Sequence, residues 1–172
     1  RGCWRCERQG MDHGRLLPHD LDAERALLGA LLLEGRVAME RLAGSPLRRE
    51  DFFTEAHREC YAAMLALYRD GQPIDLITLS DRLRERKHLD MVGGPAMLAL
   101  LVEHASILAH LDAYAEIVVR QGKRRDVIQA CTRVITAAYD EDGLASMTDA
   151  LTAAVEGLTR RRHGHTYDPA VS

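Results

Sequence analysis

The stretch from Asp51 to Leu79 constrains the fold most, because it predicts a helix, a tight turn and the start of a second helix. Apolar residues recur at helical spacing between about Glu55 and Arg69, which is typical of a helix that packs one wide face against a core. The pattern stops at Asp70-Gly71, where a glycine suits the left-handed residue that commonly ends a helix. The predicted apolar face consists of Cys60, Tyr61, Met64, Leu65, Leu67 and Tyr68.

The elements around this stretch are also predicted to be helical. Asp20 is a suitable N-cap for a first helix, and Gly29 inside that helix suggests that another helix approaches it closely. Either Asp75 or Thr78 can cap the helix after the turn. Aromatic residues make up only 5% of the chain, while the helix formers Ala and Leu are abundant. We therefore expect an all-α fold.

Composition excludes several classes of protein. The chain of 172 residues is 47% hydrophobic and 28% charged, which is the balance of a globular protein with a core. Its net charge of −3 leaves no overall basic footprint for nucleic acid. No apolar run approaches the roughly 20 residues of a membrane span, and the first ten residues do not form a secretory signal. We therefore expect no membrane association. Its four cysteines suggest no disulfide framework, so we also expect a reducing, cytoplasmic location.

The chain is predicted to have five parts. Residues 1–17 form a flexible N-terminal extension, 18–106 a globular helical head, 107–142 a helical hairpin, 143–163 a last helix and 164–172 a flexible tail. The pattern between about residues 111 and 140 fits one long helix or two helices joined near Gln121-Gly122. A long apolar stripe must be buried, either by folding back on itself or by another subunit.

Five short strings, in register and in order, resemble the N-terminal domain of DnaB-type replicative DNA helicases. Each string alone is weak, but together they cover about Pro18 to Arg162 and form a strong signal. The strings are PHDLDAERALLGALL from Pro18, Asp51-Phe52-Phe53 with His57-Arg58, GQPIDLITL from Gly71, Val92-Gly93-Gly94, and Tyr114-Ala115-Glu116-Ile117-Val118.

This resemblance implies an all-α head followed by a helical hairpin at about Leu111–Tyr139 and a linker helix at about Met147–Arg162. In the family, the hairpins pair to build the N-terminal tier of a hexameric ring, and the tier receives primase. The linker helix packs on the ATPase domain of a neighbouring subunit. The chain has no G-x-x-x-x-G-K-[ST] motif, so ATP and Mg²⁺ are expected only for a full-length parent, and DNA contact only through the full assembly.

The resemblance turns two apolar stripes into candidate interfaces. A core is the default explanation of the first stripe, while its length and the family favour contact with a second copy in a dimer or ring. The second stripe is narrow, as in a helix that docks on a partner. The oligomer-interface candidates are Leu111, Tyr114, Ile117, Val118, Ile128, Val134 and Ile135, and the linker-helix docking candidates are Leu151, Val155 and Leu158.

Other motifs support weaker hypotheses. Cys3 and Cys6 have metal-ligand spacing with His13 nearby, but no second pair of ligands occurs at the usual spacing. The remnant of an upstream segment, or chance, is therefore a better explanation than a metal site. The basic runs 123–125 and 160–162 are interpreted first as solvated helix turns and second as partner or phosphate contacts. We expect no catalytic residue and no cofactor in this chain.

Two functions compete with the helicase assembly domain. One is a free-standing helical adaptor or regulator, which differs from the helicase domain in having no motor domain after Ser172. The other is a small zinc-dependent nucleic-acid binder that uses Cys3 and Cys6.

Overall fold

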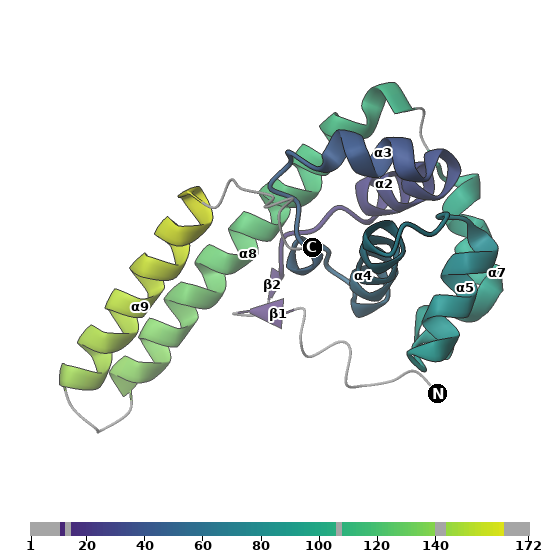
Figure 1. The fold of residues 1–172 in the computed structure, drawn as a ribbon. Coiled ribbons are helices and arrows are strands. Elements are labelled where there is room, and N and C mark those ends of the chain that lie inside the picture. Colours follow the sequence, from purple (N-terminus) through teal and green to yellow (C-terminus); the bar gives the residue numbers. More distant parts are fainter. Residues whose placement is uncertain (1–10, 13–14, 106–107, 140–143, 164–172) are drawn as a thin grey trace. The chain divides into compact units, whose positions relative to one another are not determined.

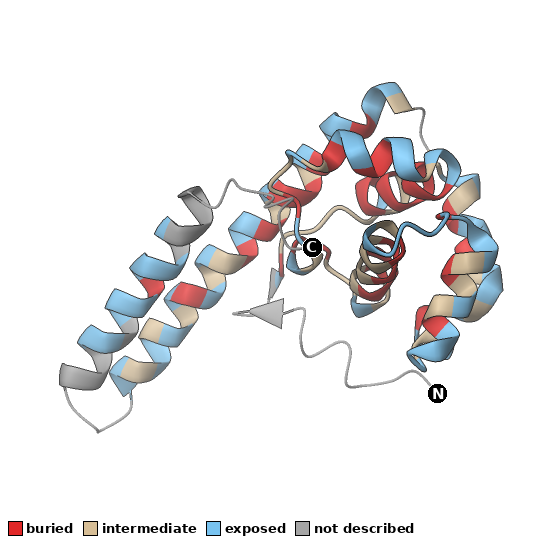
Figure 2. Cartoon of the chain, viewed as in Figure 1, coloured by how far each residue is buried: buried red, intermediate tan, exposed pale blue. Residues whose placement is uncertain are grey.

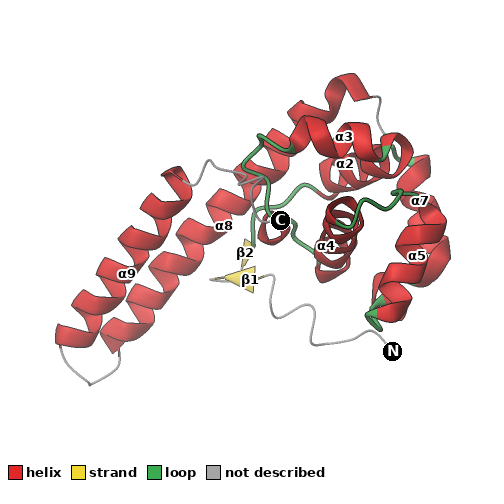
Figure 3. Cartoon of the chain, in the orientation of Figure 1, coloured by secondary structure: helices red, strands yellow, loops and turns green. Residues whose placement is uncertain are grey.

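The computed structural model describes residues 11–12, 15–105, 108–139 and 144–163, in which helices account for nearly all of the secondary structure (Figures 1 and 3). The all-α expectation is therefore confirmed. The elements in chain order are β1 (Met11–Asp12), β2 (Arg15–Leu16), α2 (Leu21–Glu34), α3 (Arg36–Leu42), η1 (Arg49–Asp51), α4 (Glu55–Arg69), α5 (Leu76–Glu85), α6 (Leu89–Val92), α7 (Gly94–Glu103), η2 (Leu108–His110), α8 (Leu111–Tyr139) and α9 (Leu144–His163).

Helix boundaries follow the capping residues of the sequence. The Asp20 side chain accepts a hydrogen bond from the Ala23 N–H at 3.0 Å and caps α2, as predicted. Thr54 caps α4 by accepting from the His57 N–H at 3.1 Å. Each cap satisfies an N–H that has no partner within its own helix, which is why the helix begins at that residue.

The turn between α4 and α5 confirms the role expected of Gly71. This glycine has φ +67°, and the Gln72 N–H donates to the Leu67 carbonyl at 2.9 Å, which closes the end of α4. Asp75 is the N-cap of α5 and accepts from the Ile77 and Thr78 N–H groups at 2.8 and 2.9 Å. The helix therefore begins at Leu76, with Asp75 rather than Thr78 as its cap.

Residues 19–122 form one compact unit, here called the head, with a single hydrophobic core. Figure 2 shows buried residues on the facing sides of its helices. The head was predicted to end at residue 106, and this boundary is wrong because the first turns of α8 bury Leu111, Ala115, Val118 and Val119 in the same core. The largest side chains of the core are Leu27, Leu28, Leu31, Phe52, Met64, Leu67, Leu79, Leu83, Leu98, Leu101 and Leu111.

Helix α8 runs without a break from residue 111 to 139. Of the two alternatives that the sequence pattern left open, one long helix is therefore the one that forms, and residues 107–142 do not fold into a hairpin by themselves. Gly122 had suggested a bend, but its place in the helix has another reason. A Cβ built on Gly122 would lie 2.2 Å from Oδ1 and 2.8 Å from Cα of the buried Asp51. The glycine therefore provides space for Asp51 against the helix, at a position where any other residue would collide with it.

The second compact unit, here called the hairpin unit, combines residues 123–163 with the described part of residues 11–18. Figure 1 shows α9 running beside the second part of α8, so the hairpin is made of α8 and α9. The helix expected at 143–163 exists, but it is one arm of this hairpin. Ala130 and Ala154 are buried, as small residues are where two helices pack closely.

The flexible termini predicted for residues 1–17 and 164–172 lie mostly outside the described residues. Within the first of them, Met11 and Asp12 pair antiparallel with Leu16 and Arg15, and Leu17 is buried. The described part of this segment therefore has secondary structure where a flexible extension was predicted.

Candidate interaction surfaces

The hairpin unit exposes an apolar surface on both of its long helices. Val127 and Ile135 of α8 are 46% and 43% exposed, and Leu151 and Val155 of α9 are 51% and 56% exposed. Val127, Cys131 and Ile135 succeed one another at the i, i+4 spacing of one helix face, so they form a stripe along α8. Apolar side chains that lie together at a surface mark sites of protein–protein contact.

The interface predicted from the sequence is only partly at the surface. Leu111 and Val118 are fully buried in the core of the head, so their assignment to an oligomer interface is wrong. Tyr114 and Ile117 are half-buried and pack against the same core. Periodicity marked these four residues as one apolar face. The head covers Leu111 and Val118, while the interface role of the half-buried Tyr114 and Ile117 stays a prediction.

The remaining candidates belong to the hairpin unit and stay predictions. Ile128 and Val134 are half-buried, and Ile135 is exposed. Leu151 and Val155 are exposed as their docking role requires, while the side chain of Leu158 lies outside the described residues. Val127 was missing from the prediction, although its spacing from Cys131 and Ile135 was the signal that could have found it.

Buried ionisable groups in the head are structural. Glu24 is 1% exposed; its Oε2 lies 2.6 Å from His57 Nδ1, and its Oε1 accepts from the Phe53 N–H at 2.8 Å. These contacts tie α2 to α4 and to the segment that precedes α4. Because the pair is enclosed, a substrate cannot reach it, and a general base needs such access.

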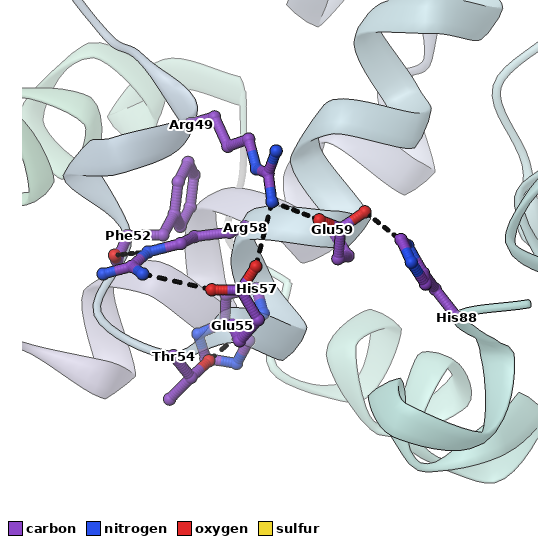
Figure 4. Close-up of polar contacts among 8 residues, drawn as sticks. All are labelled: Arg49, Phe52, Thr54, Glu55, His57, Arg58, Glu59 and His88. Carbon is purple, nitrogen blue, oxygen red and sulfur yellow. Dashed lines mark hydrogen bonds and ion pairs between the residues drawn. The ribbon is translucent and has the colours of Figure 1, made fainter. Parts of the chain in front are cut away.

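A second network surrounds the start of α4 (Figure 4). Glu59 Oε2 lies 2.6 Å from His88 Nδ1, and the other carboxylate oxygen accepts from Arg49. Arg58 Nε donates to the Phe52 carbonyl at 2.8 Å. The network joins the segments on both sides of α4, which explains why a polar cluster can lie at the edge of this core.

Burial also changes the acid–base properties of two core residues of α4. It raises the pKa of the Cys60 thiol from 9.0 to about 12, and the nearby Glu59 carboxylate acts in the same direction. It raises the pKa of the Tyr61 hydroxyl from 10.0 to about 12, while Arg69 opposes that shift. Both groups are neutral at physiological pH, which suits a place in the core.

The head carries a shallow apolar groove between the start of α5 and the start of α7. Its volume is about 470 Å³, and Leu76, Ile77 and Pro95 form its apolar lining. The Asp81–Arg84 ion pair, with an N–O distance of 3.1 Å, lies at its edge.

The described residues do not test the zinc hypothesis, and they contain no single helix that could span a membrane. Cys3, Cys6 and His13 lie outside them, so the zinc hypothesis is untested. Within the described ranges, no group of three or more His, Cys, Asp or Glu residues could hold a metal ion. No single described helix is long and apolar enough to span a membrane. Helix α7 and residues 108–139 reach that length and apolar composition only when they are taken together, and the chain bends between them.

Comparison with known proteins agrees with the resemblance. Residues 16–120 match the family model of the DnaB-like helicase N terminal domain. The replicative DNA helicase DnaB of Nostoc sp. is 34% identical over 155 residues, a match that covers 90% of this chain and 17% of that protein. The DnaB of Treponema pallidum is 35% identical over 159 residues, with coverages of 90% and 35%. The chain therefore spans only a minor part of the length of these relatives.

Solved structures share the fold. The N-terminal domain of DnaB helicase from Mycobacterium tuberculosis superposes with a TM-score of 0.72 at 31% identity, covering 82% of this chain and 98% of that one. A DnaB-like replicative helicase described with its interactions with primase has a TM-score of 0.64 at 23% identity, covering 80% and 31%. With most of its length matched by the family model, the chain belongs to the DnaB-like helicase N-terminal domain family.

Proposed function

We propose that this chain is the assembly and primase-docking domain of a replicative DNA helicase. The observation that carries the proposal is the exposed apolar surface of the hairpin unit, on a chain that belongs to this family. The relatives are named as replicative helicases, which favours this function over a free-standing adaptor. ATP hydrolysis with Mg²⁺ and duplex unwinding would belong to the parent enzyme, and the assembly would act in the cytoplasm.

Self-association through the hairpin unit is the first part of the proposal. When a second copy covers an apolar stripe, the pair is stabilised by about 25 cal/mol for each Å² of apolar surface removed from water. The exposed Val127, Ile135, Leu151 and Val155 supply that surface without any change in the head. A neighbouring ATPase domain is a second candidate for covering the exposed Leu151 and Val155 of α9. Pairing of two copies would lead to a dimer or to a ring.

Primase docking is the second part. A related helicase structure is described with its interactions with primase, and this is what supports the assignment of the same partner here. DNA would be contacted only through the complete assembly, since the chain carries a net charge of −3.

Light scattering on a sizing column tests the assembly function. We expect the unaltered chain to be a dimer or larger, and the variant Val127→Asp with Ile135→Asp to be a monomer with unchanged helix content. The matched control is Ile77→Asp, which places a charge at an exposed apolar residue of the head. Equal mass for all three proteins would contradict the proposal. Calorimetric titration with the cognate primase tests docking, and absence of binding heat would remove that partner.

A further inference from the structure

We draw no further inference here: the strongest candidate, the shallow apolar groove that Leu76, Ile77 and Pro95 line between the start of α5 and the start of α7, carries none because nothing in the structure shows what covers it.

Discussion

Replacement of Gly29 by Ala tests whether close packing of α2 against α7 determines the stability of the head. A Cβ at this position would lie 2.1 Å from the Leu101 carbonyl oxygen and 2.8 Å from the Ala105 Cα. Because carbon contacts are favourable only near 3.5–4.0 Å, the two helices would have to separate by roughly 1 Å. Overpacking of this kind typically costs about 1–3 kcal/mol, and backbone atoms cannot rotate out of the way as a side chain can.

The higher helix propensity of Ala opposes this cost only in part. Ala is favoured over Gly inside a helix by about 1 kcal/mol, so a site with free space would gain stability from the same change. At Gly29 we expect a net loss of about 2 kcal/mol, which is the upper end of the overpacking range with the propensity gain subtracted. For a unit of roughly 100 residues, this corresponds to a fall in Tm of about 8–16 °C.

Thermal and urea unfolding followed by circular dichroism measures the effect. Gly157→Ala is the matched control, because nothing lies within 4 Å of a Cβ at that position of α9. The control should be neutral or more stable, while Gly29→Ala should be less stable. If Gly29→Ala proved as stable as the unaltered chain, helix packing at this point would not be as tight as the structure requires.

Further predictions concern single residues. Glu24→Ala removes the buried partner of His57 and should lower the free energy of unfolding by about 3 kcal/mol, measured by urea denaturation; a loss below about 1 kcal/mol would contradict the structural role of the pair. Because folding raises the pKa of Cys60 from 9.0 to about 12, the native state binds the proton more tightly, so the urea midpoint should fall as pH rises above 9. In a chain without the two N-terminal cysteines, Cys131 should react with a thiol reagent and Cys60 should not; equal reactivity would show that Cys60 is accessible. Lys87→Gly relieves φ +58° at the end of α5 and should raise Tm by a few degrees, and a fall in Tm would refute strain at that residue.

The sequence predicted the elements whose signals are local. Asp20, Asp75 and Gly71 lie at helix boundaries because each satisfies or ends backbone hydrogen bonds within a few residues of its own position. Gly29 was expected to mark a close approach, and α7 is the helix that approaches. The five family strings pointed to the same all-α family that comparison then showed.

The candidate interface was harder to predict, because periodicity identifies an apolar face without saying what covers it. Leu111 and Val118 belong to the same kind of helical apolar pattern as Val127 and Ile135, yet the first two are buried in the head and the last two are exposed. The difference depends on residues far away in sequence, which pack against only the first turns of α8.

Gly122 and Arg125 also show that a local sequence pattern does not reveal which distant residues a side chain contacts. A glycine inside a helical pattern is consistent with a bend, and an arginine in a basic run is consistent with a solvated turn. Asp51 and Pro18, both distant in sequence, decide otherwise, by contact with Gly122 and by a hydrogen bond from Arg125. The sequence by itself determined the fold class, the capped helix ends and the family, since these depend on local order; only the tertiary structure decided which apolar and charged faces are buried, because burial depends on distant segments meeting in space.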